Sequence, residues 1–202
     1  MSWRRHKAHW FGPAPRRSGW WLLLSLSAFF SLAAESELPQ PTEAELKAAV
    51  VYQITRFVEW PAPPPTNAPL VIGVVGEGPL IAALEQLANA APASLGRALT
   101  IQKLPPSLSR TNAAKCHVVV IGEQVPERAM TTMLADLDGQ GILTVSALPD
   151  FCRKGGMVGL NLSDRRVQIE INLNACERAR LRPSSRLLRQ AKIVAGPTPP
   201  SR

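Results

Sequence analysis

Apolar residues recur along the chain with two different periods, and these periods predict alternating helices and strands. A spacing of about 3.6 residues predicts three helices, from Thr42 to Trp60, from Gly78 to near Pro92, and from Met130 to Gly139. Thr42 and Glu45 have the spacing of a capping box, which marks the start of the first helix. Pro61 then ends it.

Short uninterrupted apolar runs between these helices predict strands. The runs Leu70–Val75 and Val118–Ile121 are typical of strands buried on both faces, and Leu99–Leu104 and Ile142–Val145 are predicted as two further strands. Helices that alternate with buried strands favour a mostly parallel sheet with helices on both faces. We therefore expect an α/β, Rossmann-like fold.

The pattern changes after residue 150, where apolar and polar residues alternate. The alternation covers 158–163 and 167–172 around a polar turn, which predicts an antiparallel hairpin with one solvated face. Asn174 with Glu177 predicts the cap of a short helix, and a last helix is predicted from Pro183 to residue 195. The expected organisation is a single domain over 42–195, with a disordered tail over 196–202.

Residues 1–34 have the three parts of a secretory signal peptide. A basic region precedes thirteen uncharged residues from Trp20 to Leu32, and small residues follow, so we expect cleavage after Ala33 or Ala34. The apolar run is shorter than the roughly 20 residues that span a bilayer, so no stable membrane insertion is expected after cleavage. Residues 35–41 are predicted as an extended lead-in, and the mature protein is expected in the periplasm.

The net charge of +8 suggests a nucleic-acid partner only until its distribution is considered. Five of the 23 basic residues precede residue 35, where no acidic residue occurs; the rest of the chain carries 18 basic and 15 acidic residues, a balance of +3. Trp60 is the only tryptophan after the leader, so an aromatic platform for stacking bases is missing. These features argue against nucleic-acid binding.

Few residues are suited to catalysis or metal binding. His6 and His9 lie in the leader, which leaves His117 as the one histidine for a catalytic triad or metal site. The cysteines and His117 lack the spacing of a zinc site. The glycine-rich turn Gly73–Gly78 lacks the spacing of a nucleotide-binding loop. We therefore expect no catalytic residue, no metal and no cofactor.

Three cysteines, Cys116, Cys152 and Cys176, allow one disulfide and one unpaired thiol in an exported protein, and the sequence leaves all three pairings open. A cluster of cations follows near the carboxyl end. It consists of Arg178, Arg180, Arg182, Arg186, Arg189 and Lys192. Such a cluster suits an acidic partner or a phospholipid, but equally a solvated helix face.

Five blocks of sequence, in order, resemble the YfiR family. They are Leu46–Ala49 with Phe57–Pro61, then Cys116–Val118, Gly155–Val158, Val167–Asn172 and Leu181–Leu188. The resemblance covers about Leu46 to Lys192. It implies a periplasmic α/β protein that forms homodimers and represses an inner-membrane diguanylate cyclase by binding its periplasmic sensor domain. Loss of such a protein raises cyclic di-GMP and promotes biofilm formation.

The cysteines depart from the family pattern. The resemblance implies two disulfides in relatives, whose cysteines correspond here to Cys116 and Cys152 with partners at Ile72 and Gly159. Because neither partner position holds a cysteine, the redox control of those relatives does not transfer directly. Cys176 is then a substitute partner or a free thiol.

Our leading hypothesis is a regulatory binding protein that clamps or occludes the sensor domain of an inner-membrane signalling protein, a diguanylate cyclase or a similar protein. The hairpin, the last helix and the Phe57–Pro61 corner are the expected contact regions. Candidate contacts there are Trp60, Glu170, Asn172, Arg186 and Arg189. The alternatives are a periplasmic small-ligand-binding or sensory subunit with its ligand near Gly73–Gly78, and an exported hydrolase that uses carboxylates such as Glu170.

Overall fold

A computed structural model describes residues 40–62, 68–90, 97–164 and 166–197. The predicted leader, its cleavage site at Ala33 or Ala34, and most of the expected lead-in and tail lie outside the described residues. Residues Pro41–Arg202 form one compact unit. No helix in the described ranges is both long and apolar enough to cross a membrane.

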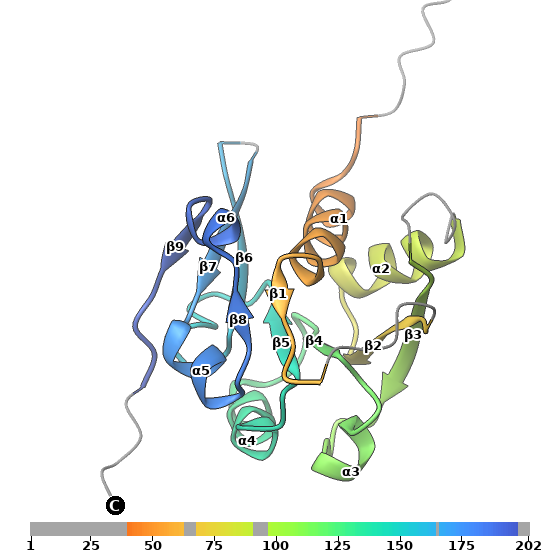
Figure 1. The fold of residues 1–202 in the computed structure, drawn as a ribbon. Helices are drawn as coiled ribbons and strands as arrows, with labels where there is room; N and C mark the ends of the chain where they lie inside the picture. Colours follow the sequence, from red (N-terminus) through yellow and green to blue (C-terminus); the bar gives the residue numbers. More distant parts are fainter. Residues whose placement is uncertain (1–39, 63–67, 91–96, 165, 198–202) are drawn as a thin grey trace, which may run out of the picture. The chain divides into compact units, whose positions relative to one another are not determined.

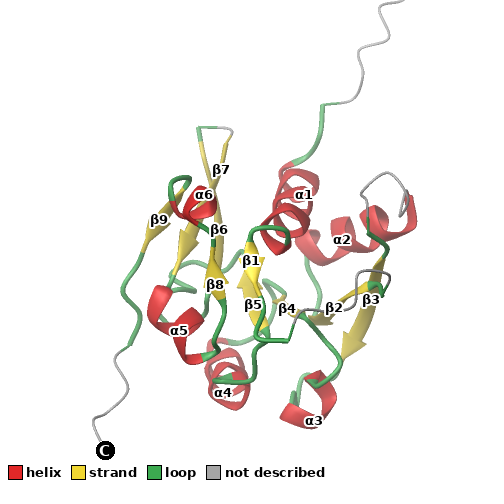
Figure 2. Cartoon of the chain, in the orientation of Figure 1, coloured by secondary structure: helices red, strands yellow, loops and turns green. Residues whose placement is uncertain are grey.

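The unit is built on a seven-stranded mixed sheet (Figures 1 and 2). Its strands are β2 (Leu70–Val75), β3 (Leu99–Leu104), β4 (Val118–Ile121), β5 (Leu143–Ser146), β6 (Val158–Ser163), β7 (Arg166–Ile171) and β9 (Ala191–Ile193). The spatial order is β3-β2-β4-β5-β6-β7-β9, and all neighbouring pairs are parallel except the β6–β7 hairpin. The predicted parallel sheet with an antiparallel hairpin is confirmed.

Helices cover both faces of the sheet because alternate residues of its central strands point to opposite sides. Val118 and Val120 of β4 belong to a core cluster with α1 (Glu43–Thr55), α2 (Pro79–Ala90), α5 (Leu173–Arg178) and α6 (Ser185–Leu188). Val119 and Ile121 belong to a second cluster, on the side of α3 (Arg110–Ala113) and α4 (Glu127–Leu137). The α/β class with helices on both faces is therefore confirmed.

The first helix begins as predicted but ends earlier. Glu45 N–H donates to Thr42 Oγ1 (3.3 Å) and Thr42 N–H donates to Glu45 Oε2 (2.7 Å), which completes the capping box. The helix ends at Thr55, and Val58–Glu59 form the short strand β1 instead of a last helical turn. The prediction of a helix to Trp60 is wrong because β1 pairs with a strand 125 positions away, β8 (Arg182–Pro183).

The predicted last helix is also wrong beyond its first turn. α6 ends at Leu188, and the following residues form β9, which pairs in parallel with β7. Val194 is buried, and its N–H donates to Ile171 O (2.9 Å). Hydrogen bonding to the open side of β7 replaces the helical hydrogen bonds that the sequence pattern suggested.

Candidate functional site

The two-stranded β1–β8 ladder brings the end of the first helix next to the carboxyl-terminal segment. Val58 lies opposite Pro183 and Glu59 opposite Arg182, and Ser184 N–H donates to Phe57 O at 2.8 Å. The ladder therefore joins two of the three regions expected to contact a partner. The third region, the β6–β7 hairpin, belongs to the seven-stranded sheet and not to this ladder.

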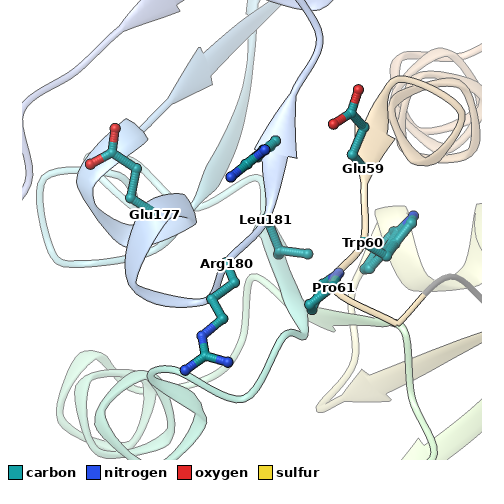
Figure 3. Close-up of a pocket in the computed structure, with 7 residues that line it drawn as sticks. Glu59, Trp60, Pro61, Glu177, Arg180 and Leu181 are labelled. Atoms are coloured by element: carbon teal, nitrogen blue, oxygen red, sulfur yellow. The ribbon is translucent and has the colours of Figure 1, made fainter.

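A cavity of about 470 Å³ opens beside this ladder (Figure 3). We call its lining the corner surface; it consists of Glu59, Trp60, Pro61, Glu177, Arg180, Leu181 and Arg182. Trp60 and Pro61 supply the accessible apolar part, whereas Leu181 is only 1% exposed; charged side chains surround them. Tryptophan and arginine are the residue types that most often dominate the energy of a protein interface.

Two neighbouring arginines are already engaged. The Arg186 guanidinium lies over the Phe57 ring, 5.4 Å from its centroid, a cation–π contact that continues the corner surface toward α6. Arg178 Nε donates to both carboxylate oxygens of Asp138, at 2.9 and 3.1 Å. By contrast, neither Arg180 nor Arg182 has an ion-pair partner among the described residues.

The inner side of Trp60 packs against His117. The two rings meet edge to face with centroids 6.2 Å apart, and His117 Nδ1 accepts a hydrogen bond from Val71 N–H at 3.0 Å. Burial lowers the pKa of His117 below its usual 6.5, and the charge of Arg97 lowers it further. An unprotonated Nδ1 is also what the Val71 hydrogen bond requires. His117 is thus a neutral structural support for the corner surface.

We expect the stability of the fold to fall as the pH drops below about 6.5. A histidine whose pKa is lowered by folding binds fewer protons in the native than in the unfolded state, so acid favours unfolding. The measurement is urea denaturation at pH 7.5 and 5.5. His117→Asn, which keeps an acceptor for Val71 N–H but cannot titrate, should reduce this pH dependence. An equal loss of stability in both proteins would contradict the assignment.

The structure places the five predicted contact residues in different environments. Trp60 lines the corner surface and Arg186 lies exposed beside it. Arg189 is exposed, but it lines a separate cavity of about 640 Å³, together with residues of the β6–β7 hairpin and of β9. Glu170 is a residue of β7. Its side chain is only 13% exposed, and its Oε1 lies 3.3 Å from Lys192 Nζ. The corner surface thus receives only part of the predicted set.

Asn172 is not a surface residue. It is 1% exposed, its Oδ1 accepts from Ala175 N–H at 3.2 Å, and its Nδ2 donates to Cys152 O at 3.1 Å. Asn172 is the N-cap of α5, the role that the sequence pattern gave to Asn174. The expectation of a partner contact at Asn172 is therefore wrong, because the side chain is used in folding.

The most exposed charges of the corner surface were not selected from the sequence. Arg180 and Arg182 belong to the recognised cation cluster, but the sequence gave no reason to prefer them to its other members. Glu59 lies within the Phe57–Pro61 corner but was not chosen as a contact, and Leu181 was not chosen either, because their meeting depends on the long-range β1–β8 pairing.

None of the three open disulfide pairings forms. Cys116, Cys152 and Cys176 are all buried free thiols. Cys116 and Cys176 belong to core clusters on opposite faces of the sheet, and the Cys152 thiol lies within hydrogen-bond reach of Met157 O and Glu170 O. Burial raises the pKa of Cys152 and of Cys176 to about 12, so both are protonated and weakly reactive at neutral pH.

The two family cysteine positions can now be located. A Cβ on Gly159 would lie 3.4 Å from Cys152 Sγ, as the sequence comparison implied. A Cβ on Gly73 would lie 2.8 Å from Cys116 Sγ, so the residue facing Cys116 is Gly73 and not the adjacent Ile72. The geometry of both pairs thus remains, although this chain has glycine where a second cysteine would stand.

The glycine-rich turn Gly73–Gly78 lies at the switch point of the sheet, where β2 separates β3 from β4 and where ligands of open α/β sheets commonly bind. Here the chain's own Glu123 occupies that place, since a Cβ on Gly78 would collide with Glu123 Oε2. A carboxylate next to the start of α2 takes the position that favours anions. Within the described ranges, no group of three or more metal-ligating side chains occurs.

Two distant proteins are among the solved structures that have a similar fold. A conserved domain protein from Vibrio cholerae O1 biovar El Tor is 15% identical with a TM-score of 0.54. An ABC domain from Streptococcus pneumoniae, solved in complex with L-Trp, is 9% identical with a TM-score of 0.52. Each match covers 75% of this chain and 60% of the solved chain. Identities this low show the fold alone.

A search of curated proteins found no match to this chain. The family model described as YfiR/HmsC-like, however, matches residues 44–192, which include the described helices and strands except for the first residue of α1 and the last residue of β9. This range contains both strands of the β1–β8 ladder and the whole corner surface. The chain therefore belongs to the YfiR/HmsC-like family.

Proposed function

We propose that the protein is a periplasmic regulator that binds an inner-membrane signalling protein and restrains it. The observation that carries this proposal is the corner surface, where a tryptophan and a proline adjoin two arginines that have no ion-pair partner in the described part of the chain. Surfaces of this composition are suited to protein partners. Membership of the YfiR/HmsC-like family and the signal-peptide pattern of residues 1–34 support the periplasmic location.

The finer proposal is that the partner is a diguanylate cyclase, whose restraint lowers cyclic di-GMP. It rests on the family relationship. The corner surface would bind the periplasmic sensor domain, with Trp60 and Arg186 as contacts. Glu170 and Arg189 would belong to a separate contact region near β7 and β9, and the protein is proposed to act as a homodimer.

The alternative of a small-ligand-binding subunit has less support. Its expected site near Gly73–Gly78 contains the Glu123 carboxylate, which would have to move before a ligand could enter. A hydrolase that uses Glu170 is also weaker, because that carboxylate is paired with Lys192. We therefore retain protein binding as the proposed function.

Deletion of the gene should raise cellular cyclic di-GMP severalfold, and the wild-type copy should restore the low level. Affinity purification from solubilised envelopes should retain the cyclase with the wild-type protein. A double variant, Trp60→Ala with Arg182→Ala, should lose most of that retention because it removes an apolar anchor and a charge from the corner surface. Circular dichroism checks that the variant is folded.

Arg128→Ala is the matched control, because Arg128 is an exposed arginine at the start of α4 and outside the corner surface. It should behave like the wild type in both measurements. Unchanged cyclic di-GMP in the deletion strain would refute the cyclase proposal. Equal retention of a membrane protein by the corner variant would refute the corner surface as its binding site.

A further inference from the structure

Helix α5 ends in a Schellman motif that has an arginine in the position usually taken by glycine. Arg180 N–H donates to Glu177 O and Leu181 N–H donates to Cys176 O, both at 2.9 Å, which is the hydrogen-bond pair of this motif. The motif requires left-handed backbone at Arg180, whose φ is +57°. Glycine adopts this conformation without steric cost, whereas an arginine places its Cβ against the backbone.

No contact in the described structure explains why an arginine is kept there. Among the residues that the structure describes, the other non-glycine positions with positive φ are Asp150 and Asp164, a residue type that tolerates this conformation. Arg180 is exposed and has no ion-pair partner among the described residues, unlike Arg178 two positions earlier, which binds Asp138. The arginine therefore lowers the stability of the free protein relative to glycine.

The side chain of Arg180 occupies a distinct part of the corner surface. Its guanidinium lies on one side of Leu181 and Pro61, and the carboxylates of Glu59 and Glu177 lie on the other (Figure 3). An anionic group that reaches Arg180 would thus avoid both carboxylates and meet apolar side chains next to the charge. Guanidinium groups bind carboxylates through paired hydrogen bonds, most strongly where water is partly excluded.

We propose that Arg180 is a specificity-determining residue that binds a carboxylate on an acidic segment of the partner protein. The identity of that partner rests on the function proposed above. The binding of a carboxylate by Arg180 can be tested without knowing that partner. The strained backbone presents the guanidinium as an exposed charge of the corner surface. The left-handed conformation lowers the stability of the fold, and the binding of the carboxylate explains why an arginine occupies this position in spite of that.

The test compares Arg180→Gly with Arg180→Lys in the full chain. Arg180→Gly relieves the backbone and should raise the melting temperature by about 3 °C. Arg180→Lys keeps the strain and the charge and should melt with the wild type. Asp150→Gly relieves a similar backbone away from the corner surface and is the control for the glycine effect. A melting temperature lowered by Arg180→Gly would overturn the proposal, because Arg180 would then be structural.

Binding is measured with a capped acidic peptide of alternating glutamate and phenylalanine, followed by tryptophan fluorescence. Because the chain has five tryptophans, the fluorescence change of Trp60 is obtained as the difference between the wild type and Trp60→Phe. The wild type and Asp150→Gly should bind alike, Arg180→Gly should bind at least about tenfold more weakly, and the affinity should fall with added salt. A matching lysine peptide should not bind. Equal affinity of Arg180→Gly and wild type, or no binding of the acidic peptide, would overturn the inference.

The two proposals can fail separately. If the acidic peptide binds through Arg180 but no membrane protein is retained from envelopes, the inference on Arg180 holds and the proposed function fails. If a cyclase is retained equally by the wild type and by Arg180→Gly, the proposed function holds and the inference on Arg180 fails.

Discussion

Replacing Gly156 with alanine should destabilise the fold by about 3 kcal/mol, the upper end of the range for overpacked sites. A Cβ at this position would collide with the aromatic ring of Phe151 at three of its atoms. The ring cannot move aside, because Phe151 is 1% exposed and belongs to the core cluster on the α4 side of the sheet. Urea denaturation measures the change directly.

Gly159→Ala is the matched control for this prediction. A Cβ on Gly159 meets its neighbours at 3.4 to 3.7 Å, which is ordinary van der Waals contact. We expect this variant to unfold within about 0.5 kcal/mol of the wild type. If both alanine variants proved equally stable, the packing of the Phe151 ring against Gly156 would not be as tight as the structure shows.

The second large effect joins the loop before β6 to β6 itself: Gly159→Cys should form a disulfide with Cys152. The new Cβ would start 3.4 Å from Cys152 Sγ, close to the roughly 3 Å that a disulfide imposes between these atoms. Closing so short a loop should stabilise the oxidised protein by roughly 2 kcal/mol. The stabilisation should appear in non-reducing urea denaturation and disappear after addition of a reductant.

Oxidation of this variant should need alkaline conditions and an added oxidant, because burial keeps the Cys152 thiol protonated with a pKa of about 12. Gly159→Ser is the control that adds a similar side chain without a second sulfur. Mass spectrometry should find the linked peptides in the cysteine variant. An oxidised protein in which Cys152 is still alkylated after unfolding would show that the predicted bond does not form.

The central sheet is predictable from sequence for a simple reason. A strand buried on both faces needs apolar residues at every position, so Leu70–Val75 and Val118–Ile121 are visible as uninterrupted runs. The capping box at Thr42 is equally local, since both of its partners lie within one helical turn. These features do not depend on the rest of the chain.

The corner surface was only partly predictable because long-range pairing creates it. Val58 continues the helical spacing of the first helix, and no local signal shows that it pairs with Pro183. Likewise, an asparagine before a short helix suits either a cap or a surface contact, and only burial shows that Asn172 is the cap. Sequence therefore located Trp60 and Arg186 near the surface but missed Arg180, whose backbone conformation is its distinguishing property.

The β1–β8 ladder also determines when a binding surface can exist during biosynthesis. Its two strands lie 125 positions apart, so the residues on either side of the cavity first meet after almost the whole chain has been made. A chain still being synthesised, or one shortened before Arg182, would lack the surface even if its parallel strands had already paired. The ladder, and the cavity lining that it brings together, therefore form only once the chain extends through Pro183 and folds.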